Sequence, residues 1–314
     1  MPELPADLHK NGFVLITGGG TGLGLAAAKR FAACGARVAI TGRREAVLEG
    51  AVKQIIAAAG GRADAAVAVG MDVRDPHSVR DGVDAVVKHW GGQLPTVVIN
   101  NAAGNFISPT EKLSPNAWKA IVDIVLMGTV HVTTDIGRRW IERRQIGVQK
   151  APDMLPQVVF MSIGASYVVK GQPFLAPSAA AKTAVLNVMN SLAVEWGKYN
   201  IRCFMVSPGP IYTEGAFSRL DPTGQNAATG DVQDHVPLGR MGTTDEYANL
   251  VAFLCSPMCS WLSGTNVHLD GGATVGGGEF GQLKKVTHEE WGLMEAAIRK
   301  QNAKDKAQRA KAKL

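Results

Sequence analysis

Cysteine is scarce in this chain of 314 residues, and its four cysteines follow no ligand pattern. Cys34, Cys203, Cys255 and Cys259 include no CxxC pair and stand near no group of histidines. Metal sites and disulfide frameworks both depend on such spacings. The sequence therefore predicts reduced, buried thiols and no metal site.

The chain also lacks long apolar runs and basic segments interleaved with aromatic residues. No run reaches the roughly 20 apolar residues that a helix needs to cross a bilayer, so we expect no membrane span. Aromatic residues make up 6% of the chain and the basic residues are scattered, so we expect no nucleic-acid partner. The net charge of +6 fits either a solvated surface or a small polyanionic ligand.

The two ends of the chain bear on its location in the cell. The first twelve residues contain Glu3 and Asp7 but no arginine, which argues against a mitochondrial presequence. The last three residues, Ala312-Lys313-Leu314, differ at one position from the Ser-Lys-Leu peroxisomal signal. A frayed basic tail is the alternative explanation. We expect a peroxisomal protein that binds the peroxisomal import receptor through these residues.

Short apolar segments alternate with amphipathic helices along most of the chain. Near-continuous apolar strands in alternating βα units indicate a parallel sheet that is covered by helices on both faces. The sequence therefore predicts an α/β fold with a doubly wound, Rossmann-type parallel sheet. The expected strands are Phe13–Thr17, Arg37–Ile40, Ala65–Val69, Thr96–Ile99, Gln157–Met161, Ile201–Val206 and Asn266–Leu269.

No shift in composition suggests a second domain. We expect one domain over residues 1–272 and a C-terminal extension with a basic tail over residues 273–314. Gln145–Pro156 has the character of a loop insertion. Residues 212–237, rich in Gly, Asp, Asn and Pro, are too long for a simple connection and resemble an active-site lid.

A glycine-rich turn, Thr17–Gly24, follows the first expected strand and opens the first helix. Glycine allows a sharp turn and a close backbone approach, and a helix N-terminus offers unpaired N–H groups to an anion. A structural glycine loop is the alternative, but strand, turn and helix together favour a dinucleotide site. The expected cofactor contacts are Gly18, Gly19, Gly20, Thr21, Gly22 and Leu23.

The end of the second strand indicates which dinucleotide is bound. NAD enzymes present an acidic residue there to the ribose 2′-hydroxyl. This chain has Thr41-Gly42-Arg43-Arg44, and the guanidinium of Arg43 suits a 2′-phosphate, so we expect NADPH. A solvated arginine pair is less favourable because cations are disfavoured at a helix start. Asp72, after the third strand, either accepts a hydrogen bond from the adenine amino group or caps a helix.

Three motifs resemble the short-chain dehydrogenase/reductase family over about residues 12–272. They are TGxxxGxG from Thr17 to Gly24, Asn-Asn-Ala-Ala-Gly at 100–104, and Pro-Gly-Pro-Ile at 208–211. The family normally has tyrosine four residues before its lysine, but here Ser178 precedes Lys182. Because carbonyl reduction uses that phenol as a proton donor, a ketone reductase or alcohol dehydrogenase is not expected.

Two further positions narrow the resemblance to one branch of this family. Ala165 stands where the family has its serine, and Leu175 stands where enoyl-carrier-protein reductases of the Tyr-x₆-Lys kind have tyrosine. Segments 101–111, 177–182, 195–199 and 215–220 instead resemble the 2,4-dienoyl-CoA reductase branch, particularly its mitochondrial-type animal members. There the tyrosine stands fifteen residues before the lysine, and this position is Tyr167, one of only four tyrosines.

The resemblance implies NADPH-dependent reduction of a 2,4-dienoyl-CoA to a 3-enoyl-CoA in β-oxidation of unsaturated fatty acids. Negative charge then develops on the thioester oxygen, which needs hydrogen-bond donors. Tyr167 and Asn105 would supply a phenol and an amide donor. Lys182 would hold the nicotinamide ribose, and its charge would lower the pKa of the Tyr167 phenol. Ser178 would support the pocket by hydrogen bonding.

The resemblance also implies further contacts and a homotetramer. Pro208, Gly209, Pro210 and Ile211 would line the nicotinamide. The acyl-CoA would contact Arg43, Arg74, Phe106, Ser114 and Arg219. The three arginines suit the phosphates of coenzyme A. Solvent exposure is the alternative for Arg74 and Arg219, and a helix N-cap is the alternative for Ser114.

Two other functions remain open on the sequence alone. One is a short-chain reductase specific for another acyl-CoA. The other is a catalytically silent NADP-binding scaffold, because Met127 stands where the mitochondrial-type enzymes have asparagine. The same resemblance makes the mitochondrion the alternative compartment.

Overall fold

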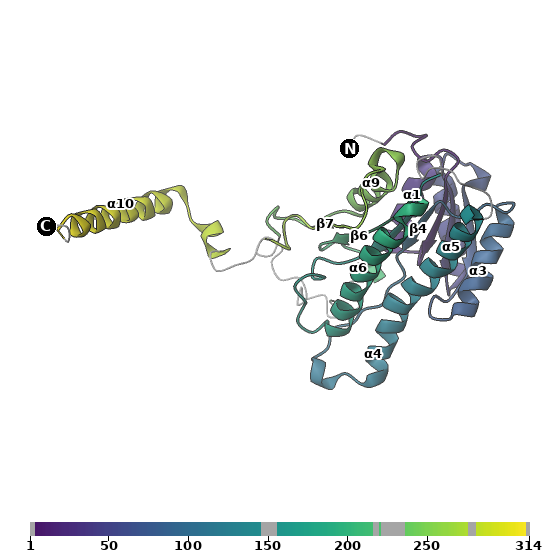
Figure 1. Cartoon of the computed structure of the whole chain (residues 1–314), viewed down its shortest axis with the longest axis horizontal. Coiled ribbons are helices and arrows are strands. Elements are labelled where there is room, and N and C mark those ends of the chain that lie inside the picture. The colour runs from purple at the N-terminus through teal and green to yellow at the C-terminus, as the bar shows by residue number, and fades with distance from the viewer. Residues whose placement is uncertain (1–3, 146–155, 216–219, 221–235, 276–280, 312–314) are drawn as a thin grey trace. The chain divides into compact units, whose positions relative to one another are not determined.

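The computed structural model describes residues 4–145, 156–215, 220, 236–275 and 281–311 (Figure 1). The chain divides into two compact units, Met1–Thr274 and Val275–Leu314. The first unit holds the sheet and its helices. The second contains helix α10 (His288–Lys311). The predicted loop insertion falls mostly on residues 146–155 and the predicted lid mostly on 216–235, so neither can be assessed within the described residues.

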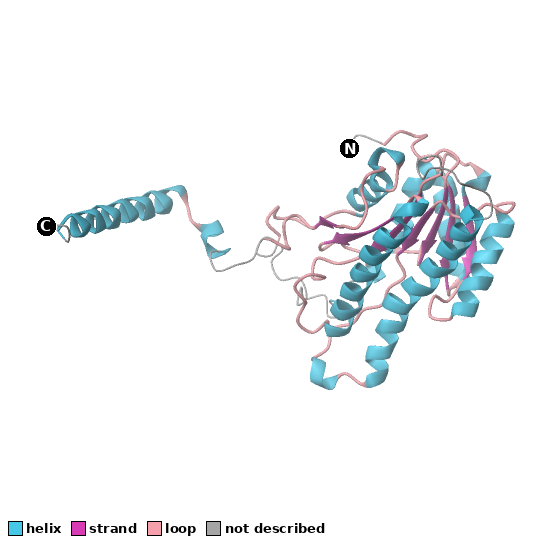
Figure 2. Cartoon of the chain, viewed as in Figure 1, coloured by secondary structure: helices cyan, strands magenta, loops and turns pink. Residues whose placement is uncertain are grey.

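The first unit is built on a seven-stranded parallel sheet with the order β3-β2-β1-β4-β5-β6-β7. Helices lie on both of its faces (Figure 2), so the predicted doubly wound α/β fold is confirmed. The chain reverses its direction of travel across the sheet between β1 and β4, and crevices form at the carboxyl ends of strands at such a point. The strands are β1 (Phe13–Thr17), β2 (Arg37–Gly42), β3 (Ala66–Gly70), β4 (Val97–Asn100), β5 (Val158–Ile163), β6 (Ile201–Pro208) and β7 (Asn266–Leu269).

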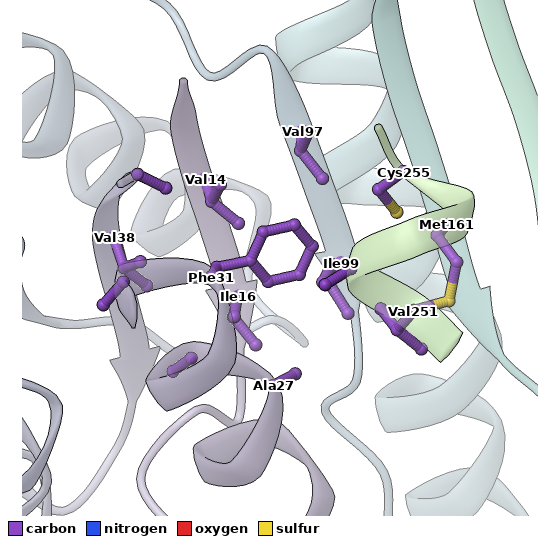
Figure 3. Close-up of a cluster of buried hydrophobic side chains, with 14 of the residues drawn as sticks. Val14, Ile16, Ala27, Phe31, Val38, Val97, Ile99, Met161, Val251 and Cys255 are labelled. Carbon is purple, nitrogen blue, oxygen red and sulfur yellow. The ribbon is translucent and has the colours of Figure 1, made fainter. Parts of the chain in front are cut away.

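Successive residues of a strand point to opposite faces of the sheet, and both faces here are apolar. Val14 and Ile16 of β1 pack on one face with Phe31, while Leu15 between them packs on the other. The first face is shown around Phe31 in Figure 3. It is covered by helices α1 (Gly22–Ala33), α2 (Glu45–Ala58) and α9 (Thr244–Leu254).

The opposite face is covered by α3 (Pro76–His89), α6 (Ala176–Trp196) and a helical stretch from Pro115 to Gln145. This stretch comprises α4 (Pro115–Val122), the π-helical turn η3 (Asp123–Met127) and α5 (Gly128–Gln145). Among the described residues it is the only helical stretch long and apolar enough to cross a membrane. Buried core helices meet the same criteria, and its Val132 and Ile136 are fully buried in the core.

Most expected strands agree with the observed bounds to within two residues. The first helix begins at Gly22, because the end of the glycine turn itself forms the first turn of the helix. The thiols of Cys34, Cys203 and Cys255 are buried as predicted, and that of Cys259 is only half-buried.

Candidate active site

A cavity of about 470 Å³ lies at the carboxyl ends of the strands, beside the point where the strand order reverses. Residues that follow β1, β2, β3 and β4 line it, together with Ile163 at the end of β5. Many of the residues predicted from the sequence meet here. They are Gly18, Gly20, Thr21, Gly22, Leu23, Arg43, Asp72, Asn105 and Lys182.

Two glycines of the turn are required by their surroundings. Gly22 has a φ of +55°, a left-handed conformation that disfavours side chains. A Cβ on Gly24 would lie 2.5 Å from Nδ2 of Asn101. Gly19 does not line the cavity, because it faces the sheet and a Cβ there would lie 2.5 Å from Cγ2 of Ile40. Gly19 packs against β2, and its contact with the cofactor stays a prediction.

Asn101 joins the end of β4 to the glycine turn. Its Nδ2 donates to the carbonyl oxygens of Thr17 and Gly18 at 2.9 and 3.1 Å. The Oγ1 of Thr17 in turn accepts from the backbone N–H groups of Asn101 and Ala102. The sequence identified the motif that contains Asn101, but it did not indicate that Asn101 binds the glycine turn. These bonds hold the turn in the shape that forms one wall of the cavity.

Two independent features of the cavity fit a dinucleotide. Helix α1 begins at its wall, its first turn carries no acidic residue, and its N-cap Thr21 makes no side-chain cap bond. The first N–H groups of the helix are therefore available to an anion. Thr41 also lines the cavity, and its Oγ1 is buried without a hydrogen-bond partner in the described structure. An orphaned hydroxyl of this kind favours a polar ligand group beside it.

Arg43 and Asp72 mark the far end of the cavity. Arg43 is exposed in its lining, directly after β2. Asp72 forms an ion pair with Arg74, with Nη2 and Oδ2 2.5 Å apart, and this hydrogen bond lowers the pKa of the Asp72 carboxyl. The helix-cap alternative for Asp72 is wrong, because Asp75 caps α3. Arg74 is not among the lining residues and is engaged by Asp72.

Tyr167, Ser178 and Asn105 form a hydrogen-bonded group next to the cavity. The phenol oxygen of Tyr167 lies 3.0 Å from Oγ of Ser178, and Nδ2 of Asn105 donates to it at 3.4 Å. Tyr167 is on the loop after β5, Ser178 is in the first turn of α6, and Asn105 is on the loop after β4. Three segments that are remote in sequence thus bring these side chains together.

Lys182 lines the cavity from α6 and is only 7% exposed. Its Nζ donates to the carbonyl oxygens of Gly164 at 2.7 Å and Ile163 at 3.4 Å. Burial lowers the pKa of Lys182 to about 8. The prediction that its charge lowers the pKa of the phenol was wrong, because burial dominates at Tyr167 and raises the phenol pKa.

Several other predicted residues lie outside this lining. Pro208–Ile211 connect β6 to the next segment, where the N–H of Gly209 donates to the carbonyl of Leu269 and Ile211 is buried. Ser114 caps α4 by accepting a hydrogen bond from the N–H of Ala117. It is therefore the helix N-cap that was the alternative to a substrate contact. Arg219 falls outside the described residues.

Some further residues lie in or near the cavity wall. The ring of Phe106 packs against the core, and its N–H donates to Oδ1 of Asn105. Met127 ends the π-helical turn and does not line the cavity, whereas Ile124 of the same turn does. Thr213 and Gly215 also line the cavity, and the sequence indicated them only as part of the lid.

Comparisons with known proteins show which proteins the chain resembles. A family model described as "Enoyl-(Acyl carrier protein) reductase" matches residues 18–274. A Caenorhabditis elegans protein named as an uncharacterized oxidoreductase is 44% identical over 96% of this chain and 93% of its own. A C. elegans protein named as a probable, (3E)-enoyl-CoA-producing 2,4-dienoyl-CoA reductase is 41% identical over 97% of this chain and 95% of its own. The mouse peroxisomal 2,4-dienoyl-CoA reductase is 35% identical over 85% of each chain.

Two solved structures show the same fold. A short-chain dehydrogenase from Bacillus anthracis aligns with a TM-score of 0.72 and 37% identity, over 86% of this chain and 98% of its own. A 3-ketoacyl-(acyl-carrier-protein) reductase from Brucella melitensis, complexed with NADH, aligns with a TM-score of 0.73 and 28% identity, over 85% of this chain and 99% of its own.

Proposed function

Because this chain belongs to the short-chain dehydrogenase/reductase family and resembles the 2,4-dienoyl-CoA reductases, we propose that it reduces a 2,4-dienoyl-CoA to a 3-enoyl-CoA with NADPH. The family and its relatives establish an oxidoreductase that uses a nicotinamide cofactor. Our proposals are the reaction itself, the use of a cofactor with a 2′-phosphate, and a place for the enzyme in β-oxidation of unsaturated fatty acids.

One observation carries the proposal. The phenol of Tyr167 lies within hydrogen-bond distance of both Ser178 and Asn105, next to the cavity that Lys182 lines. This group contains donors for a substrate oxygen, although no tyrosine stands four residues before the lysine. The named dienoyl-CoA reductases among the relatives support the same substrate class.

The protein's part in the reaction follows from these side chains. A bound nicotinamide cofactor supplies the hydride. Charge then accumulates on the thioester oxygen of the substrate, where fixed donors stabilise it. Since burial raises the pKa of Tyr167, its phenol keeps its hydrogen at neutral pH and acts as a donor. Asn105 supplies a second N–H, and Ser178 holds the phenol oxygen in place.

The remaining roles concern cofactor binding and the final proton. Nζ of Lys182 donates to two backbone carbonyl oxygens. Its third N–H is left to donate to a hydroxyl of the nicotinamide ribose. The α carbon of the substrate must finally be protonated. Tyr167, or a water molecule that it orients, is the donor that the arrangement provides.

The preference for NADPH rests on charge at one end of the cavity. Arg43 and Arg44 line it, and Asp72 is the only acidic residue among the described lining residues. Asp72 is paired with Arg74 and follows β3, whereas NAD enzymes present their acidic residue at the end of β2. A 2′-phosphate meets two guanidinium groups there, which are the side chains that bind phosphate best.

The proposal is tested by NADPH oxidation with 2,4-dienoyl-CoA, 2-enoyl-CoA and 3-ketoacyl-CoA in parallel, and with NADH in place of NADPH. We expect turnover only with the dienoyl substrate, a marked preference for NADPH, and a 3-enoyl-CoA product by mass spectrometry and NMR. Turnover of the enoyl or ketoacyl substrate instead would assign another acyl-CoA reductase. Cofactor binding without turnover of any acyl-CoA would assign a silent scaffold.

We also propose a peroxisomal location and a homotetramer. The location is supported by the relatives named as peroxisomal enzymes and by the resemblance of Ala312–Leu314 to a peroxisomal signal. Large apolar side chains on the surface, such as Trp261 at 99% exposure and Val194 at 86%, support an assembly that covers them. Light scattering after gel filtration measures the mass of the assembly.

A further inference from the structure

Tyr167 lies on an irregular loop between the end of β5 at Ile163 and the start of α6 at Ala176. Helices and strands hold side chains more rigidly than loops do, and a misplacement of about 1 Å at a reacting group costs on the order of a hundredfold in rate. Local turn bonds, such as the N–H of Gly171 to the carbonyl of Tyr167, shape the loop, and one backbone bond, from the N–H of Ser166 to the carbonyl oxygen of Pro208 at 3.1 Å, attaches it to the end of β6.

Two threonine hydroxyls add side-chain hydrogen bonds to the loop on either side of Tyr167. Oγ1 of Thr274 donates to the carbonyl oxygen of Ser166 at 3.0 Å. Oγ1 of Thr183, on α6, donates to the carbonyl oxygen of Val168 at 2.7 Å. The residues immediately before and after the tyrosine are therefore held by hydroxyls from two different parts of the fold.

Thr274 is itself the end of a chain of hydrogen bonds that begins in the sheet. Oγ of Ser207 donates to Oδ1 of Asn266 at 2.7 Å. Nδ2 of Asn266 lies 3.2 Å from Nε2 of His268, and Nδ1 of His268 lies 3.2 Å from Oγ1 of Thr274. Ser207 is fully buried in β6, and Asn266 and His268 belong to β7.

Donor and acceptor types give this chain a single direction. The hydroxyl of Thr274 has one hydrogen, which it donates to Ser166, so it must accept from His268. The neutral imidazole then carries its hydrogen on Nδ1, and its Nε2 accepts from the amide of Asn266. The oxygen of that amide accepts from Ser207. Each group donates one hydrogen bond in the direction of the loop, so every bond in the chain has a donor hydrogen.

A second contact ties the same segment to the loop. Nζ of Lys170 donates to the carbonyl oxygen of Ala273 at 3.1 Å. The segment after β7 therefore contacts the tyrosine loop at Ser166 and at Lys170, one residue before Tyr167 and three residues after it. A side chain held between two such contacts loses much of its freedom to move away from Ser178 and Asn105.

We propose that Thr274 is a positioning residue for Tyr167, and that the chain Ser207–Asn266–His268–Thr274 transmits the rigidity of β6 and β7 to the tyrosine loop. This inference rests on the proposed role of Tyr167 in the reduction of the dienoyl-CoA. Thr274 touches neither the cavity lining nor the group formed by Tyr167, Ser178 and Asn105, so it acts only through the backbone of the loop.

The first test compares Thr274→Val, which keeps the shape and removes the hydroxyl, with Thr274→Ser, which restores it. Thr134→Val is the matched control, because its Oγ1 also donates to a carbonyl oxygen, that of Val130, but on the exposed side of α5. We expect Thr274→Val to lower kcat by roughly tenfold or more, with KM for NADPH and the melting temperature close to those of the control. Thr274→Ser should recover most of kcat.

The second test does not depend on turnover. The full chain is labelled with carbon-13 at the phenol carbon of tyrosine, and the Tyr167 signal is assigned with Tyr167→Phe among only four tyrosines. We expect the Tyr167 signal to shift or broaden in Thr274→Val, to return in Thr274→Ser and to stay unchanged in Thr134→Val. His268→Leu, which interrupts the chain one step earlier, should move the signal in the same direction.

The outcomes separate this inference from the proposed function. An unchanged Tyr167 signal and an unchanged kcat in Thr274→Val would overturn the inference and leave the proposed function standing. A loss of kcat that tracks a loss of melting temperature and is not recovered by Thr274→Ser would also overturn it. If the wild-type protein reduces no dienoyl-CoA, the proposed function fails, and the Tyr167 signal alone decides whether Thr274 positions the loop.

Discussion

The phenol oxygen of Tyr167 lies 3.0 Å from Oγ of Ser178. Ser178 occupies the position, four residues before Lys182, at which short-chain reductases normally carry their tyrosine. The tyrosine on the loop and the serine on the helix are therefore partners in one hydrogen bond. The phenol reaches the neighbourhood of the usual site from another segment of the chain, where it can also meet the amide of Asn105.

Replacing Tyr167 by phenylalanine removes the phenol and leaves the ring. We expect kcat on a dienoyl-CoA to fall about a hundredfold, the size of a lost oxyanion donor, with little change in NADPH affinity. Steady-state kinetics and cofactor fluorescence measure the two quantities. Tyr199→Phe, which removes a phenol that lies 3.4 Å from Gln145, is the control and should retain full activity. Unaltered turnover in Tyr167→Phe would exclude this residue from the chemistry.

Arg43→Ala removes one of the two guanidinium groups at the end of the cavity. A hydrogen bond to a charged group contributes about 1.5–3 kcal/mol, so NADPH should bind about 10- to 100-fold more weakly while NADH binding changes little. Titration of the protein with each cofactor measures this difference. Arg80→Ala, an exposed arginine of α3, is the control. Equal weakening for both cofactors would contradict contact with a 2′-phosphate.

Lys182 should leave a signature in the pH dependence of stability. Burial lowers its pKa from 10.5 to about 8, so between these values the unfolded chain binds one more proton than the folded one. The contribution of Lys182 to the free energy of unfolding therefore rises with pH across this window, by about 1 kcal/mol per pH unit.

Urea unfolding of the cofactor-free protein at several pH values tests this prediction. Buried phenols and thiols act in the opposite sense at high pH, so the informative quantity is the difference between variants. Lys182→Met should lack the rise seen in the wild type, and Lys53→Met, at an exposed position of α2, should keep it. Parallel pH profiles for wild type and Lys182→Met would contradict the lowered pKa.

Gly24→Ala should destabilise the protein and weaken cofactor binding together. The new Cβ would lie 2.5 Å from Nδ2 of Asn101 and 2.6 Å from the carbonyl oxygen of Gly18, so the turn must shift. Such overpacking costs roughly 1–3 kcal/mol. Gly50→Ala is the opposite control, because nothing lies within 4 Å of its Cβ position on α2. It should stabilise the protein by roughly 0.5–1 kcal/mol. Thermal unfolding and NADPH titration distinguish the two.

The peroxisomal location is tested with a fluorescent protein fused to the N-terminus. The complete chain should coincide with a peroxisomal marker, and a chain without Ala312–Leu314 should be diffuse. Coincidence of the complete chain with a mitochondrial marker would replace the peroxisome by the alternative compartment. Retention in peroxisomes after the deletion would show that the address lies elsewhere in the chain.

Much of this fold was predictable because its determinants are local. The strand bounds of Phe13–Thr17 and Asn266–Leu269 agree with the structure to the residue. The first is an apolar segment followed by glycine, and the second alternates polar with apolar residues and is followed by Asp270-Gly271. The glycine turn, Asn105 and Lys182 were placed at one cavity because the carboxyl ends of parallel strands meet at one edge of the sheet. The packing of Gly19 against Ile40 was not predictable in the same way, because Ile40 lies on another strand.

The sequence by itself determined the βα alternation, the cofactor turn and the position of the tyrosine, because spacing along the chain carries that information. Tertiary structure alone decided how these groups behave. The hydroxyl of Thr274 donates to the carbonyl oxygen of Ser166, 108 positions away in the sequence, and no local sequence pattern predicts this hydrogen bond. The pKa of Tyr167 is raised and not lowered, because burial of the phenol outweighs its hydrogen bonds with Ser178 and Asn105. Lys182 is turned toward backbone carbonyl oxygens. Burial and distance between remote residues govern electrostatics, and both exist only in the folded chain.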